Sequence, residues 1–236
     1  NMIVSDDGLI WIAGNDKIAV HEQNGTLVKQ FTNGLTGCKD VALDSNGNIY
    51  AAANNKLLKM DANGTEIWSV SSPTPYISSL DIYKDSAIYT VSTSGQGSVK
   101  IFNLDGNLTK TIDDNSIGQN IFQHNWNTTS IRCFPNGNFI AYSSGGILFD
   151  RNGTYIKRLT AGKNKITINS QGLYLSKYLR DSHTNSTVTE LTGIRSDQDK
   201  CYAFTPIGDL VIARGNDTIE IWTMTYRTHG LSLIHI

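Results

Sequence analysis

Residues 46–68 read NGNIYAAANNKLLKMDANGTEIW, in which three short apolar runs are separated by turn-forming residues. Each run has the length of an ordinary β-strand. The Asn-Gly pairs at 46–47 and 63–64 favour type I′ hairpin turns, because Asn and Gly tolerate the positive φ that these turns require. Together with the preceding run at 39–44, this stretch predicts an antiparallel unit of four strands.

The same turns recur along the chain. Asx-Gly turns occur at Gly25, Gly64, Gly106 and Gly153, which are 39, 42 and 47 residues apart. A second series of turns keeps the same phase and lies at Gly8, Gly47, Ser86, Gly137, Gly172 and Gly208. Two turns at a fixed phase in each period predict repeated four-stranded units, which is typical of a β-propeller.

We therefore predict an all-β fold: a six-bladed β-propeller of four-stranded antiparallel blades, forming a single domain over residues 1–230. The blades are expected at about 1–32, 38–71, 77–113, 130–160, 164–192 and 199–225. Second strands are apolar on both faces whereas fourth strands alternate, so the fourth strand should form the outer rim. The fifth blade is predicted to be degenerate, with three strands at 165–169, 173–178 and 187–191, and the sixth to lack its outer strand.

The repeat unit at 46–51 and 56–68 resembles NHL-type and PQQ-like β-propeller repeats. The signature residues of WD40, kelch and Tyr-Trp-Thr-Asp propellers are missing. The resemblance implies the propeller fold. Propellers of similar type include SMP-30-like lactonases and streptogramin-lyase-like enzymes, so the resemblance also offers a metal-dependent hydrolase or lyase with a channel site as an alternative function.

Residues with catalytic potential do not form a recognisable pattern. Carboxylates on several inner strands would be needed for a metal-dependent enzyme, but the acidic residues alternate outward or lie in turns. The five histidines are dispersed, and Cys38, Cys133 and Cys201 form no CxxC pair. We therefore predict no catalytic residues, no metal and no cofactor.

The repeat period breaks between Ser86 and Gly137, where extra residues fall at 115–127. This segment joins the third blade to the fourth, and 180–186 is interpreted as a connection between the second and third strands of the fifth blade. Both connections should share one loop-rich face, and insertions in repeats often mark the binding face. The candidate partner-binding residues are Phe122, His124, Asn125, Trp126, Arg180 and His183. The alternative is that the aromatic side chains pack onto the blades.

Seven Asn-x-Ser/Thr sequons begin at Asn24, Asn63, Asn107, Asn127, Asn152, Asn185 and Asn216. They are compatible with N-glycosylation of a secreted protein. Three of them coincide with the Asx-Gly turn followed by a β-favouring threonine. Turn chemistry is therefore the simpler interpretation.

Composition narrows the class of partner. The net charge is −1 and basic residues do not cluster, so we expect no nucleic-acid partner, and no apolar run is long enough to span a membrane. The leading hypothesis is a non-catalytic binding module for a protein or glycan, at a cell surface or outside the cell, within a longer polypeptide. A purely structural module is a third possibility. Residues 231–236 resemble a translated sequencing adapter and are interpreted as an artefact or a tail. The alternative is a genuine outer strand, since these residues are apolar enough.

Overall fold

The computed structural model describes residues 1–14, 16–53, 55–71, 76–92, 97–118, 122, 130–142, 145–159, 167–168, 173–175, 178–181, 187–190, 199–206, 209–214, 219–227 and 230–235. Of these, 173–201, 213–219 and 222–235 are described by their backbone alone. The described strands form four-stranded sheets in which sequence neighbours pair antiparallel.

The first three sheets are regular. Sheet 1 consists of β1 (Met2–Val4), β2 (Ile10–Gly14), β3 (Lys17–His21) and β4 (Leu27–Phe31). Sheet 2 consists of β5 (Cys38–Leu43), β6 (Ile49–Ala53), β7 (Lys56–Met60) and β8 (Glu66–Ser71). Sheet 3 consists of β9 (Ile77–Tyr83), β10 (Ala87–Ser92), β11 (Val99–Phe102) and β12 (Leu108–Ile112).

The remaining sheets follow the same order. Sheet 4 consists of β13 (Ser130–Cys133), β14 (Phe139–Tyr142), β15 (Gly146–Phe149) and β16 (Tyr155–Leu159). Sheet 5 consists of β17 (Thr167–Ile168), β18 (Leu173–Leu175), β19 (Tyr178–Asp181) and β20 (Thr187–Glu190). Sheet 6 consists of β21 (Asp199–Phe204), β22 (Leu210–Arg214), β23 (Ile219–Arg227) and β24 (Gly230–His235).

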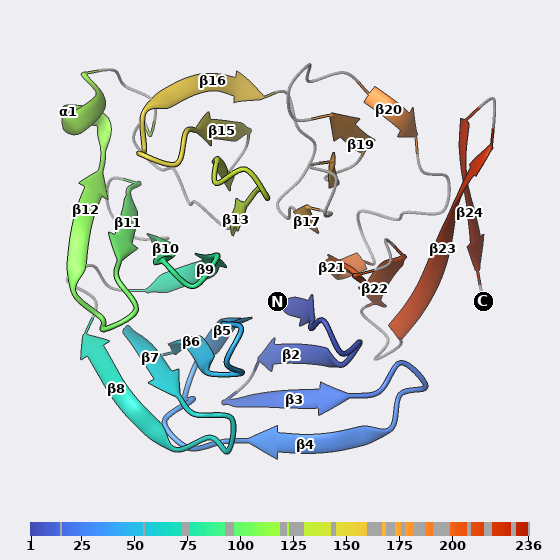
Figure 1. Ribbon diagram of the computed structural model, residues 1–236, viewed down its shortest axis with the longest axis horizontal. Coiled ribbons are helices and arrows are strands. Elements are labelled where there is room, and N and C mark those ends of the chain that lie inside the picture. The colour runs from blue at the N-terminus through green and yellow to red at the C-terminus, as the bar shows by residue number, and fades with distance from the viewer. Residues whose placement is uncertain are drawn as a thin grey trace.

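The six sheets stand in a ring, with the first strand of each sheet toward the centre and the fourth at the rim (Figure 1). Sheet 6 closes the ring against sheet 1, where Met2 and Ile10 pack with Ala203 and Val211. The predicted all-β, six-bladed propeller is confirmed.

The two predictions about incomplete blades need correction. The stretch expected as one strand at 173–178 is split, and β18 and β19 pair with each other as separate strands. The sixth sheet has a fourth strand, because β24 pairs with β23 from Trp222 and His235 to Arg227 and Gly230. The strand forms because the free edge of β23 pairs with it, and such pairing is not visible in the turn pattern from which the sixth blade was predicted.

Burial follows the predicted gradient from centre to rim. All five residues of β6 are buried, as expected for a strand with a neighbouring sheet on either side. In the rim strand β8 only Trp68 and Val70 are partly buried. Side chains from adjacent sheets form shared cores, one of which joins Ala42 and Tyr50 of sheet 2 to Leu80 of sheet 3. The sheets are therefore stabilised mainly by one another.

The turns differ from the type I′ geometry expected from Asn-Gly. Between β7 and β8, the amide of Gly64 donates to the carbonyl of Asp61 at 3.0 Å, and the amide of Asp61 donates to the carbonyl of Thr65 at 2.9 Å. Only Gly64 has a positive φ, of 85°, whereas Asn63 does not. The register shifts at this turn. The hairpin is therefore a type I turn followed by a glycine bulge.

Successive antiparallel strands reverse direction, so the connections of each sheet alternate between two faces of the ring. We call the face with the first-to-second and third-to-fourth strand turns, at Gly8, Gly25, Gly47 and Gly64, the turn face. The opposite face carries the second-to-third connections and the links between sheets, and we call it the loop face. Among the described residues, no helix has the length and apolar character that a membrane crossing requires.

Some turn glycines also allow neighbouring sheets to pack closely against each other, because they have no Cβ. A Cβ on Gly64 would overlap the ring of Phe31 on the rim of sheet 1, whereas a Cβ on Gly25 meets no described atom within 4 Å. Both glycines have positive φ, 85° and 88°. Substitution of Gly25 therefore tests backbone strain alone, whereas substitution of Gly64 tests the same strain together with a steric clash between sheets.

We expect Gly25→Ala to lower the free energy of unfolding by about 1 kcal/mol, because it adds only left-handed backbone strain. Gly64→Ala should lower it by about 3 kcal/mol, because it adds overpacking against Phe31. Urea unfolding followed by circular dichroism measures both. Equal losses would show that sheets 1 and 2 are not closely packed at this turn.

Candidate functional site

Phe122 is placed in the core, not on a face. Its side chain is 1% exposed and its ring centroid lies 6.1 Å from that of Phe149. Its amide donates to Asp114 Oδ1 at 2.6 Å, at the start of the short helix α1 (Asp114–Ile117) that follows β12. A buried ring cannot offer contact area to a partner, so for Phe122 the alternative of packing onto the blades is correct.

Four other candidates, His124, Asn125, Trp126 and His183, lie outside the described residues, and their role in partner binding stays a prediction. The backbone of Arg180 lies within β19 and pairs with Tyr174. The segment beginning at Arg180 is therefore not a second-to-third connection. The connection after β19 leads to the fourth strand and leaves from the turn face. The two irregular segments do not share a face as predicted.

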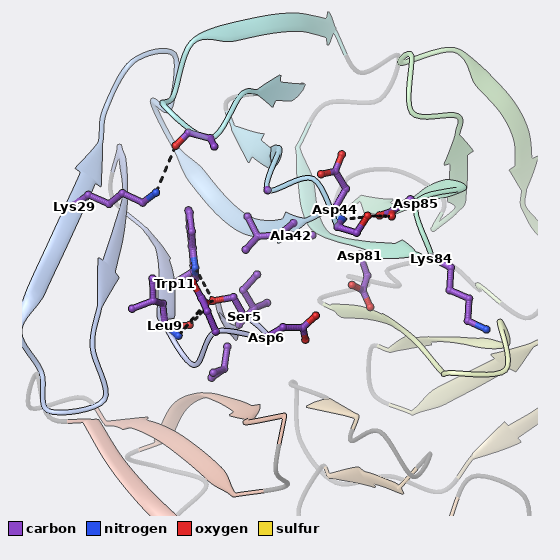
Figure 2. A pocket seen from close by; sticks show the side chains of 17 residues that line it. Ser5, Asp6, Leu9, Trp11, Lys29, Ala42, Asp44, Asp81, Lys84 and Asp85 are labelled. Atoms are coloured by element: carbon purple, nitrogen blue, oxygen red, sulfur yellow. Dashed lines mark hydrogen bonds between the residues drawn. The ribbon is translucent and has the colours of Figure 1, made fainter.

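The turn face contains a groove of about 650 Å³ that the sequence did not indicate. It runs from the centre of the ring outward between sheets 1 and 2, and sheet 3 closes its inner end (Figure 2). Its walls come mainly from the ends of the inner strands and the turns that follow them. The charged residues that line it are Asp6, Asp7, Lys29, Asp44, Asp81, Lys84 and Asp85.

Trp11 contributes an aromatic side chain to one wall of the groove. Trp11 stacks on Phe31 with a centroid separation of 6.0 Å, and its Nε1 donates to Ser5 Oγ at 3.1 Å. The ammonium group of Lys29 lies 5.1 Å from the centroid of the Trp11 ring and donates to the carbonyl of Ala62 at 3.5 Å. This wall therefore already accommodates a cation over an aromatic face.

Two carboxylates of the groove, those of Asp44 and Asp85, are held by hydrogen bonds from turn residues. Asp44 caps its own turn, accepting from the amides of Asn46 and Asn48 at 3.0 and 2.9 Å. Asp85 accepts from the amide and the hydroxyl of Ser45, and these hydrogen bonds lower the pKa of its carboxyl. The geometry of sheets 2 and 3 therefore fixes these two negative charges in place.

Asp6 and Asp81 lie at the inner end of the groove and point toward one another across its opening (Figure 2). Asp6 is exposed, and no described side chain pairs with it. Asp81 accepts from the amides of Ile82 and Cys133 at 2.9 and 2.7 Å. Burial raises the pKa of the Asp81 carboxyl, and the nearby guanidinium of Arg132 opposes this shift.

Behind this end of the groove, inner strands of sheets 2, 3 and 4 are joined by a buried polar network. The fully buried Asp40 accepts from the amide of Leu80 at 3.1 Å and from Ser79 Oγ at 2.5 Å. Arg132 Nη1 reaches Asp40 Oδ2 from sheet 4, also at 3.1 Å. Burial lowers the pKa of Arg132, but the carboxylates of Asp40 and Asp81 outweigh this effect and raise it.

This network has a structural explanation. Each charged atom is matched by an opposite charge or by backbone donors and acceptors, as buried charges require. Within the described part of the chain, no group of three or more His, Cys, Asp and Glu side chains is placed to hold a metal ion. The arrangement can anchor strands and present negative charge.

Six four-stranded sheets in a closed ring, with a groove at the mouth of the central channel, define this protein as a β-propeller. No known family description and no curated protein matches its sequence. It is similar in structure to a protein of unknown function from Bacteroides caccae, with a TM-score of 0.68 and 16% identity over 89% of this chain and 83% of that one.

It is also similar to the WD40 β-propeller domain of Doa1, with a TM-score of 0.72 and 13% identity over 94% of this chain and 77% of that one. Identities this low show a common fold alone.

We expect Asp40→Asn to destabilise the protein by about 3 kcal/mol, because it removes the carboxylate that pairs directly with the buried Arg132 and leaves only that of Asp81 nearby. The matched variant Asp40→Asn/Arg132→Leu should lose less than the sum of the two single variants, by about 1.5 kcal/mol or more. A double-mutant cycle from chemical unfolding measures this coupling. Additive losses would mean that the ion pair is not a coupled unit.

Proposed function

We propose that this β-propeller is a non-catalytic interaction module that binds a positively charged segment of a partner protein in the groove of the turn face. The observation that carries the proposal is the groove itself, a space of about 650 Å³ with five aspartates and two lysines on its walls. Pockets of this volume are large enough for several side chains of a bound segment.

Charge and aromatic surface together favour a cationic ligand. The carboxylates come from three sheets, and those of Asp44 and Asp85 are held by turn hydrogen bonds. A lysine or arginine side chain could therefore meet negative charge that needs no reordering, which reduces the entropy lost on binding. Lys29 over Trp11 illustrates the preference of the aromatic wall for an ammonium group.

The proposal keeps the protein partner expected from the sequence. It places the docking site on the turn face instead of the loop face. A glycan partner has less support, because a neutral sugar could hydrogen-bond to the aspartates but would gain no charge attraction from a net negative groove. The descent from NHL-type or PQQ-like repeats and a place within a longer surface polypeptide remain part of the proposal. The lactonase- or lyase-like alternative has no observation among the described residues that favours it.

A labelled hexa-arginine peptide tests the charge preference by fluorescence anisotropy. We expect Asp6→Asn to weaken its binding roughly two- to fivefold, the effect of one exposed ion pair. The matched control Glu66→Gln removes an exposed carboxylate on β8, away from the groove, and should leave binding unchanged. Hexa-glutamate should not bind.

A second pair of variants tests the location. Ala62 is exposed at the groove edge and Thr36 is exposed on the loop face, so Ala62→Trp should abolish hexa-arginine binding whereas Thr36→Trp should not. Circular dichroism checks that both variants fold. Loss of binding in Thr36→Trp with retention in Ala62→Trp would place the docking site on the loop face and overturn the proposal.

A further inference from the structure

The sequons at the third turns of sheets 1 to 4 are not required by the geometry of those turns. In the turn after β3, Gly25 N donates to Glu22 O, and the turns after β7, β11 and β15 repeat this bond with Gly64, Gly106 and Gly153. In sheets 1, 2 and 4 the turns between the first and second strands repeat this hydrogen bond. There Gly8, Gly47 and Gly137 donate in the same way to the residue three positions earlier.

The two series of turns nevertheless differ in sequence. The described third turns all include or directly precede a sequon, beginning at Asn24, Asn63, Asn107 and Asn152. The described first turns contain Asp7-Gly8-Leu9, Asn46-Gly47-Asn48 and Asn136-Gly137-Asn138, and none of these is a sequon. The turn itself therefore does not require the threonine, although the Thr65 hydroxyl also hydrogen-bonds the Asp61 carboxylate and Thr109 Oγ1 donates to the carbonyl of Ile101 at 2.9 Å.

Sheet 3 separates the two explanations further. Its third turn has Asp105 in the position that Asn63 occupies in sheet 2, so the Asx-Gly-Thr pattern is lost there. The next asparagine, Asn107, begins Asn107-Leu108-Thr109 and restores a sequon two residues later. Turn chemistry alone predicts no such displacement.

The asparagine side chains are available for modification. Asn63, Asn107 and Asn152 are exposed, as are the threonines two residues beyond them. The turn of sheet 2 is capped by the carboxylate of Asp61, which accepts from the amides of Asn63 and Thr65 at 2.9 and 2.8 Å. The carboxamide of Asn63 is therefore not needed to hold its own turn.

The same holds in the other two sheets. Asn103 Oδ1 caps the turn of sheet 3 and accepts from the amide of Asn107 at 2.8 Å. In sheet 4 Asp150 Oδ1 accepts from the amide of Asn152 at 2.9 Å. These bonds use the backbone amides. Among the described residues, none hydrogen-bonds to the side-chain carboxamide of Asn63, Asn107 or Asn152. Asn24 differs, because its Nδ2 donates to Glu22 and its Oδ1 accepts from the amide of Thr26.

We propose that Asn63, Asn107 and Asn152 are N-glycosylation sites that place a row of glycans along the rim of the turn face. In the reaction, Nδ2 of the asparagine forms a bond to the anomeric carbon of a polyprenyl-pyrophosphate-linked oligosaccharide. The bond from that carbon to the pyrophosphate oxygen breaks, Nδ2 loses one proton, and polyprenyl pyrophosphate leaves. The proposal goes beyond partner binding and does not depend on the groove.

The test is to secrete the chain from a eukaryotic host behind a signal peptide and to release glycans with peptide-N-glycosidase in H₂¹⁸O. Each occupied asparagine becomes an ¹⁸O-labelled aspartate that peptide mass spectrometry locates. We expect the label at Asn63, Asn107 and Asn152, and none at Asn46, a turn asparagine without a sequon. A secreted, folded chain without label at these three sequons would overturn the proposal.

Matched variants connect each glycan to its threonine. Thr65→Val and Thr154→Val keep a β-branched side chain at the start of the rim strand and remove the hydroxyl. Each should lose the label at Asn63 or Asn152 alone, with an unchanged circular dichroism spectrum. Label that persists at Asn63 in Thr65→Val would contradict a sequon-directed modification.

Discussion

The inner strands of sheets 1 to 4 are apolar on two faces, and stacking of the sheets in a ring buries both of them. The fully buried strand β6 shows the constraint most clearly, since its alanines, Ile49 and Tyr50 contact sheets on either side. A propeller removes the exposed end faces that a linear stack would leave. Glycine turns then let the sheets approach closely enough to share these cores, as Gly64 does against Phe31.

Polar groups near the axis are consequences of that ring. Inner strands of adjacent sheets come within hydrogen-bond distance, and Asp40 and Asp81 each accept from the backbone of the next inner strand. A carboxylate that accepts backbone bonds and pairs with Arg132 satisfies the requirements of burial. Where the inner strands end, carboxylates such as Asp6 are no longer enclosed, and the groove of the turn face begins.

The repeat predicted most of the fold, because strand length, turn residues and apolar alternation are local properties. It was wrong where pairing decides the outcome. Residues 173–178, expected as one strand, belong to two, β18 and β19, and β24 completes a sheet that was expected to lack its rim strand. It was also wrong about the turns, since the carboxylate of Asp61 stabilises a type I turn that Asn-Gly alone does not specify. The prediction that Phe122 contacts a partner was wrong, because its ring is buried against Phe149, which is distant in sequence.

The sequence by itself determined the number of sheets, their order from centre to rim and the positions of the sequons, because each follows from residues within one repeat. Only the tertiary structure decided which carboxylates meet. Three repeats contribute the groove carboxylates Asp6, Asp44, Asp81 and Asp85. Because these residues are far apart in the sequence, their spacing does not predict that they line one groove. The ring brings them together because it sets the ends of successive inner strands side by side, and that placement depends on packing between sheets.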